Sequence, residues 1–279
     1  MTVPKFSEIS RRQFLQHSSA LGAASLLGFA EIAAAEPPPE ITKIRLVKGP
    51  WLCFAPIYLA EELLRLEGFH EIEYINISAS IPVTLSDSAD ISLFGGPSIL
   101  PAIDAGMPLK VIAGLHVGCW ELFGNDRVDS ITGLKGRKVA VSALRGVEHI
   151  WISSMLAYVG MDPNKDIDWV PTGKLEESQR RFLAGEVDAF LAFPPQPQDM
   201  RAIRAGQVIV NTTLDRPWSQ YFCCIVGANQ QFLRQYPVAA KRALRALLKA
   251  TDICAEDPER VARFLGEKGY EPRYDVALE

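Results

Sequence analysis

Cysteine and histidine are scarce in this chain of 279 residues. There are five cysteines, an odd number and too low a density for a disulfide-framed domain, although one or two bridges are compatible with an oxidising compartment. The adjacent pair Cys223-Cys224 is typical of a buried strand rather than of a strained disulfide between neighbours. No C-x-x-C spacing occurs. The four histidines are scattered: His17, His70, His116 and His149. We therefore predict no metal site and no cofactor.

Runs of positive charge are also missing. The chain has 29 Lys and Arg against 33 Asp and Glu, which gives a net charge of −4. This balance argues against nucleic acid and against an anionic membrane surface as partners. With 48% hydrophobic and 22% charged residues, the composition is that of a globular protein with a proper core.

The N-terminus has the layout of a secretory signal. Arg11 and Arg12 precede Phe14-Leu15, an apolar run covers 20–30, and the alanines at 33–35 suit a signal peptidase. The adjacent arginines favour the twin-arginine route, which exports folded proteins to the periplasm. The apolar run, about 12 residues, is shorter than the roughly 20 needed to span a bilayer. A basic-tipped surface helix is the alternative. We predict a signal peptide at 1–35, and no lipid anchor because 20–36 contains no cysteine.

After the signal, strand and helix patterns alternate. A proline-rich linker at 36–40 precedes the first βα series, and a second series begins after a change of character near 119–130. Such alternation predicts an α/β protein whose sheets are rich in parallel strands and covered by helices on both faces. The apolar strand at 221–226 is followed only by helices, so we expect the chain to cross back into its first lobe. The predicted lobes are 41–120 with 225–279, and 121–224, joined by hinge crossings.

Ligands of open α/β sheets bind beyond the carboxyl ends of the strands. Four loops occupy such positions, with glycines for close backbone approach, aromatic rings and one side-chain cation, Arg145. Each loop also has a structural interpretation as an ordinary turn, core residue or surface cap. The predicted ligand-binding residues are Trp51, Phe54, Ala55, Pro56, Gly95, Gly96, Pro97, Ser98, Ser142, Leu144, Arg145, Gly146, His149, Phe193 and Pro194. We predict no catalytic residue among them.

The ordered motifs resemble those of nitrate/sulfonate/taurine-type substrate-binding proteins of ABC transporters, within a superfamily that includes thiamine-pyrimidine proteins. They span 45–254 and comprise Trp51 with Ala55–Glu61, Ser88–Ile91 before Gly95-Gly96, Ala105–Pro108, Leu134–Val141, Gly160–Pro163 and Ala184–Phe190. The resemblance implies a two-lobed periplasmic binding protein of type II that holds a solute between its lobes. In two respects the chain departs from it: the segment 78–87 is short for a helix, and the chain ends early, at Glu279.

The resemblance implies a periplasmic solute-binding component of an ABC importer, with a small anion or a planar heterocycle as its solute. Its expected partners are an inner-membrane permease and ATPase, besides the twin-arginine export machinery, and we expect a monomer. Two alternatives stay open. One is an enzyme on the same fold, similar to a thiamine-pyrimidine synthase, with Cys53, Cys223, Cys224 and His149 as its only candidate reactive groups. The other is an extracytoplasmic sensor.

Overall fold

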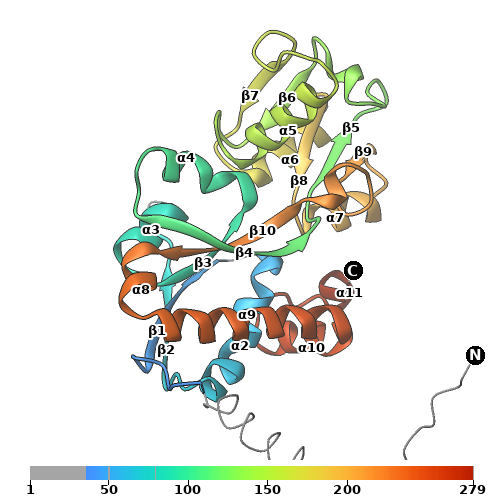
Figure 1. Ribbon diagram of the computed structural model, residues 1–279. Helices are drawn as coiled ribbons and strands as arrows, with labels where there is room; N and C mark the ends of the chain where they lie inside the picture. The colour runs from blue at the N-terminus through green and yellow to red at the C-terminus, as the bar shows by residue number, and fades with distance from the viewer. Residues whose placement is uncertain (1–35, 50, 79, 279) are drawn as a thin grey trace, which may run out of the picture. The chain divides into compact units, whose positions relative to one another are not determined.

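The computed structural model describes residues 36–49, 51–78 and 80–278. The predicted signal peptide at 1–35, with His17, lies outside the described residues. Ten strands form two five-stranded sheets, ordered β2-β1-β3-β10-β4 and β7-β6-β8-β5-β9 (Figure 1). The first comprises β1 Lys43–Lys48, β2 Glu71–Asn76, β3 Ile91–Gly95, β4 Leu109–Val117 and β10 Phe222–Asn229. The second comprises β5 Glu121–Gly124, β6 Lys138–Val141, β7 Asp168–Pro171, β8 Ala189–Ala192 and β9 Gln207–Asn211.

Helices cover both sheets, which we call the first and the second lobe together with their helices. The first lobe has α2 Ala55–Leu66, α3 Ile81–Asp87, α4 Leu100–Asp104, α8 Gln230–Gln235, α9 Pro237–Glu256, α10 Pro258–Glu267 and α11 Tyr274–Leu278. The second has α5 Val147–Tyr158, α6 Leu175–Leu183 and α7 Gln196–Ala202. Short 3₁₀ turns are η1 Leu52–Phe54, η2 Gly96–Ser98, η3 Thr132–Leu134 and η4 Trp218–Gln220. Short as the segment 78–87 is, it does form a helix, α3.

One strand in each sheet runs against the other four. β5 pairs antiparallel with β8 and β9, and β10 pairs antiparallel with β3 and β4, whereas the neighbours of β1 and of β6 are parallel. β5 and β10 are the strands that the chain enters directly after each crossing between the lobes (Figure 1). The return of the chain through an apolar strand agrees with the prediction, while β5, only four residues long, was not foreseen.

The two crossings are hydrogen-bonded to each other. Trp120, between β4 and β5, donates its backbone N–H to Oγ1 of Thr212 at 3.0 Å, and its carbonyl oxygen accepts from both N and Oγ1 of Thr212 at 2.9 Å. The chain turns into the first crossing through Gly118 and Cys119, whose φ angles are 88° and 82°. Such angles cost a residue other than glycine free energy, so the tertiary contacts around Cys119 must hold it in place.

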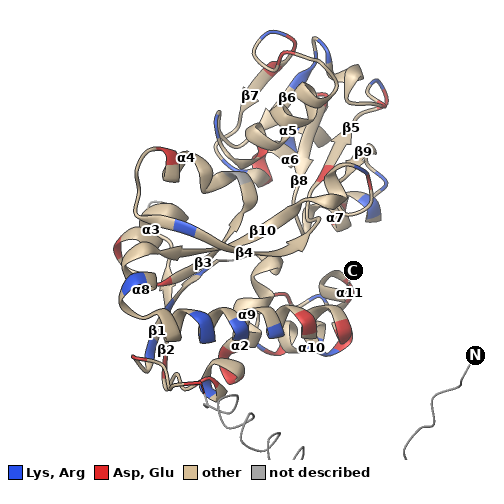
Figure 2. Ribbon diagram, viewed as in Figure 1, with Lys and Arg blue, Asp and Glu red and all other residues tan. Residues whose placement is uncertain are grey.

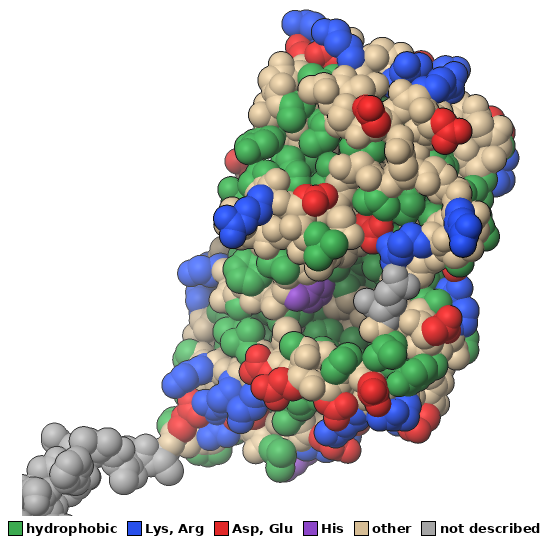
Figure 3. All heavy atoms as spheres, turned by 90° about the vertical axis from the view of Figure 1, so that its right-hand side faces the viewer, with side chains coloured by type: hydrophobic (Ala, Val, Ile, Leu, Met, Phe, Trp, Pro, Cys, Tyr) green, Lys and Arg blue, Asp and Glu red, His purple; other side chains and the backbone are tan. Residues whose placement is uncertain are grey.

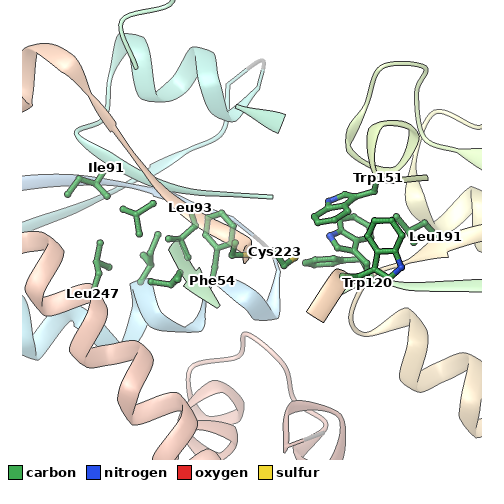
Figure 4. Close-up of a cluster of buried hydrophobic side chains, with 14 of the residues drawn as sticks. Phe54, Ile91, Leu93, Trp120, Trp151, Leu191, Cys223 and Leu247 are labelled. Carbon is green, nitrogen blue, oxygen red and sulfur yellow. The ribbon is translucent and has the colours of Figure 1, made fainter. Parts of the chain in front are cut away.

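A single buried apolar cluster extends through both lobes. It includes Phe54 and Leu93 from the first lobe and Trp120 and Trp151 from the crossing and the second lobe. Cys223 lies between these two groups of side chains (Figure 4). The lobes therefore share a packed junction, and burial of these side chains from water stabilises it.

The first lobe also depends on the pairing of α2 with α9. Small residues, among them Ala243, Ala246 and Ala250, form the buried face of α9 and permit close approach of the two helices. The Glu67 carboxylate at the end of α2 accepts a 2.7 Å hydrogen bond from Arg245 of α9, and this arginine lowers the pKa of the carboxyl below its usual value. Charged side chains otherwise lie mainly on helices and loops, and the strand ribbons are mostly uncharged (Figure 2). Within the described part of the chain, no helix combines the length and the apolar character of a membrane span.

Gly118→Ala tests the packing of the crossings. A Cβ at residue 118 would overlap the Thr213 side chain, and the left-handed backbone adds its own cost. We expect urea unfolding to show a loss of about 1–2 kcal/mol from the backbone and about 1–3 kcal/mol more from the overlap.

Gly136→Ala is the matched control, because φ there is 69° and nothing lies within 4 Å of the new Cβ. In this variant the free energy of unfolding should fall only by the backbone contribution of about 1–2 kcal/mol. Equal losses in the two variants would show that the crossings are not tightly packed at Gly118.

Candidate functional site: an aromatic cleft between the lobes

A cavity of about 450 Å³ opens between the two lobes. Its walls come from the loop after β1, the end of β3, the first crossing, the start of α5, the loop before α6 and the end of β8. Figure 3 shows apolar side chains around a hollow on one face of the molecule. The lining residues are Trp51, Cys53, Phe54, Ile81, Gly95, Ser98, Trp120, Ser142, Val147, Glu148, Gly173, Lys174, Leu175, Glu176, Phe193 and Cys224.

Aromatic pairs lie on both sides of this cleft. The Trp51 and Phe54 rings of the first lobe are 5.4 Å apart at 47°. The rings of Trp120 and Phe193, from the crossing and the second lobe, are 4.6 Å apart at 51°. Aromatic faces offer a large apolar area with defined geometry, so the cleft is suited to a flat, partly apolar solute held between the two pairs.

The most deeply buried charged group of the cleft is a carboxylate. Glu148 is 4% exposed and accepts a hydrogen bond of 2.8 Å from the Ser142 hydroxyl. It lies in the first turn of α5, where the helix dipole favours a negative charge. The Glu148 carboxylate therefore already occupies the start of α5, where an anionic ligand would otherwise be favoured.

The other charges of the cleft lie at its edge. Lys174 and Glu176 are exposed, and Lys174 is the only cationic residue in the described lining. Because the buried charge is negative and the exposed ones oppose each other, the cleft suits an N–H donor or a cation better than a small anion.

Six of the sequence-predicted residues line the cleft: Trp51, Phe54, Gly95, Ser98, Ser142 and Phe193. They come from four different loops, which the fold brings together at the ends of β1, β3, β6 and β8. Ser98 donates to the Gly95 carbonyl oxygen at 2.7 Å, so its hydroxyl holds the turn closed.

The remaining predicted residues lie elsewhere. Leu144 and Arg145 are exposed outside the lining, and φ of 63° at Arg145 turns the chain there. Gly146 is the N-cap of α5, and the His149 ring packs on Trp169 at 4.5 Å. Residues outside the cleft lining also include Gly96, close to the backbone of Phe222, and Pro194, whereas Ala55 and Pro56 line a second cavity of about 410 Å³. Pro97 lies in η2, and its side chain is outside the described part of the structure.

Sequence reasoning missed ten of the sixteen lining residues, among them Trp120, Glu148 and Cys224. Trp120 lies in a crossing, where no strand-end rule applies, and Cys224 lies within a strand. Glu148 had a usable signal, since an acidic residue in the first turn of a helix directly after a strand end lies where ligands bind.

Four of the five cysteines gather where the crossings meet the first lobe, and all five are unpaired thiols in the structure. Hydrogen bonds with Cys119, Cys223 and Cys53 hold the pKa of the Cys224 thiol well below its usual range. Hydrogen bonds with Cys119 and Cys224 instead raise the pKa of Cys223. Burial lowers the pKa of the His116 imidazole, but its hydrogen bond with the Cys224 sulfur raises it, and the net pKa is above the usual value.

Comparisons with known proteins agree with this architecture. The family model described as NMT1/THI5 like matches residues 55–261. The chain belongs to the NMT1/THI5-like family. A twin-arginine signal model matches residues 8–28, which confirms the predicted signal, and the protein is exported. A search of curated protein sequences found no significant match.

Solved structures share the NMT1/THI5-like chain's fold at low identity. The periplasmic nitrate-binding protein NrtA from Synechocystis PCC 6803 matches with a TM-score of 0.68 and 22% identity, over 86% of this chain and 70% of that one. The alkanesulfonate-binding protein SsuA from Xanthomonas axonopodis pv. citri, bound to MOPS, matches with a TM-score of 0.69 and 17% identity, over 88% of this chain and 83% of that one. The aliphatic sulphonate binding protein SsuA from Escherichia coli matches with a TM-score of 0.69 and 17% identity, over 85% of this chain and 77% of that one. The predicted family resemblance and the two-lobed type II fold are confirmed.

Ser142→Ala should destabilise the protein, because the buried Glu148 carboxylate loses a hydrogen bond of the charged kind. We expect a loss of about 1.5–3 kcal/mol in urea unfolding at neutral pH. Ser154→Ala is the control. Ser154 lies in α5, the helix that carries Glu148, but it is exposed and its hydroxyl donates to the Trp151 carbonyl oxygen. Indistinguishable midpoints for the two variants would contradict the assigned role of Ser142.

Proposed function

We propose that the protein is the periplasmic solute-binding component of an ABC importer and captures a small solute between its lobes. The observation that carries the proposal is the cleft of about 450 Å³ whose aromatic walls come from both lobes. Export through the twin-arginine signal and the shared fold with periplasmic binding proteins support it. Its partners are then a membrane permease and an ATPase, and the binding unit is a monomer.

Capture requires the lobes to approach one another. Two crossings, at 118–120 and between β9 and β10, connect them, and hinge closure around a ligand is a general motion of such paired lobes. The solute adds contacts only in the closed form, and its binding energy therefore shifts the population towards closure. The predicted lobe boundaries, 41–120 with 225–279 and 121–224, stay part of this proposal with one change: β10 begins at Phe222, so 222–224 belong to the first lobe.

The charge of the cleft favours one of the two predicted solute classes. A small anion would meet the buried Glu148 carboxylate without a buried cation to offset it. A planar heterocycle with an N–H donor or a positive charge would stack between the aromatic pairs and donate to Glu148. We therefore propose a small, flat, nitrogen-bearing heterocycle as the solute.

Binding without turnover is part of the proposal. The described lining places no imidazole beside its hydroxyl groups, and the Ser142 hydroxyl is engaged with Glu148. Of the two cysteines in the described lining, Cys224 is only 1% exposed and Cys53 is half-buried. This arrangement offers a solute recognition rather than attack by an exposed nucleophile.

A thermal-shift panel on the exported protein tests the proposal, with amino-substituted pyrimidines, other flat nitrogen heterocycles, nitrate, sulfonates and taurine. A solute at 100 times its Kd should add about 2.7 kcal/mol and raise Tm by several degrees. We expect stabilisation by a heterocycle. A cooperative melt that no compound shifts would count against the binding function.

Glu148→Gln and Arg145→Ala separate the two solute classes by titration calorimetry with the stabilising compound. Glu148→Gln should weaken binding about 10-fold or more, because it removes a charge-assisted hydrogen bond of about 1.5–3 kcal/mol. Arg145→Ala, next to the cleft but outside its lining, is the control and should leave affinity unchanged. Weaker binding only in Arg145→Ala would instead indicate an anion.

A further inference from the structure

A thiol–imidazole cluster occupies the junction of the two crossings with the first lobe. One ring nitrogen of His116 and the sulfurs of Cys119 and Cys224 all lie within 4.8 Å of one another. His116 is at the end of β4, Cys119 is in the first crossing, and Cys224 is in β10, which follows the second crossing. Cys53, in η1, lines the cleft together with Cys224 and the second cavity together with His116. Three thiols and one imidazole thus converge from three separate segments.

One ring nitrogen of the imidazole is left for a metal. Nδ1 of His116 lies 3.2 Å from the Val117 carbonyl oxygen, to which it can donate, and 3.6 Å from the Cys119 sulfur. Nε2 is buried and has no hydrogen-bond partner among the described residues. Metal-binding histidines commonly donate one ring N–H to a backbone carbonyl, which leaves the other nitrogen free for the metal.

The backbone is irregular at both cysteines. Cys119 holds φ at 82°, a conformation that favours glycine. The pairing of β10 with β4 shifts register on both sides of Cys224, as at a β-bulge, which re-aims a side chain. Such irregularities persist where a local arrangement is needed, and here both bring sulfur atoms to the same point.

We propose that a ring nitrogen of His116 and the sulfurs of Cys53, Cys119 and Cys224 bind one thiophilic d¹⁰ cation, Zn²⁺ or Cu⁺. Three sulfurs and one nitrogen form a common tetrahedral donor set for zinc, and thiolates also select Cu⁺. In a tetrahedral site with Zn–S bonds near 2.3 Å the donors are about 3.8 Å apart, so the donors of His116, Cys119 and Cys224, within 4.8 Å of one another, need only small side-chain movements.

The cluster can be reached from two cavities and lies where the two crossings meet the first lobe. Cys53 and Cys224 border the cleft, and His116 and Cys53 border the second cavity, of about 410 Å³, so an ion has a route in. The ion would connect the first crossing with the strand after the second, and with the loop that carries Trp51 and Phe54. Metal binding therefore stabilises the junction about which the lobes close.

Cobalt titration of the full chain, reduced and freed of metal with a chelator, tests the proposal. One equivalent of Co²⁺ should give intense sulfur-to-cobalt charge-transfer absorption and the d–d bands of a tetrahedral site. Zn²⁺ and Cu⁺ are then added in separate competitions, and the ion that displaces cobalt at the lower concentration is assigned. The same ion should raise Tm.

Cys224→Ser and Cys119→Ser should each weaken binding by more than the roughly 10–100-fold typical of outer-shell changes. Cys254→Ser is the matched control, because Cys254 lies in α9 outside the cluster. Far-UV circular dichroism checks that each variant is folded. Cys119→Ser changes a half-buried residue and so provides a second variant if Cys224→Ser does not fold.

Three results would overturn the proposal. The first is a folded, fully reduced protein without cobalt–thiolate absorption. The second is an equal loss of absorption in Cys254→Ser and in the cluster variants. The third is an intact mass of the exported protein that shows a disulfide among the cluster cysteines together with no bound metal.

Discussion

The reciprocal hydrogen bonds between Trp120 and Thr212 are the constraint on which the rest of the structure depends. They join the outgoing and the returning crossing of the chain at one point. Trp120 directly precedes β5 and Thr212 directly follows β9, so these hydrogen bonds extend the β5–β9 pairing to the point where the chain enters and leaves the second lobe. The cleft opens beside it, and the cysteine cluster packs against it. Packing, the solute site and the proposed metal site thus share one small region.

Recognition in the cleft follows from the distribution of charge. The fold resembles proteins whose names record nitrate and sulfonates as ligands, yet the deepest charge in this cleft is the Glu148 carboxylate. A scaffold shared at this level of identity does not fix the ligand, because function resides in the site rather than in the fold. The aromatic pairs and the buried carboxylate together favour a flat solute that donates a hydrogen bond.

Much of the fold could be predicted from local sequence patterns. The termini of the helix Ala55–Leu66 can be read from the sequence, because a proline lies in its first turn and a glycine follows its end. β5 was missed because four residues are too few to show a period. Strand-end loops located Trp51, Ser142 and Phe193 in the cleft lining, whereas Arg145, in the same loop as Ser142, is exposed outside the lining. The cysteine cluster was hidden because its members are far apart in sequence; His116 and Cys119, three residues apart, were the one local signal.

Small-angle X-ray scattering of the exported protein, with and without its stabilising solute, tests the central claim most directly. Closure of the lobes on a solute in the cleft should reduce the radius of gyration as binding saturates, and Glu148→Gln should require more solute for the same change. A saturating solute that leaves the scattering profile unchanged would contradict capture by closure of the two lobes.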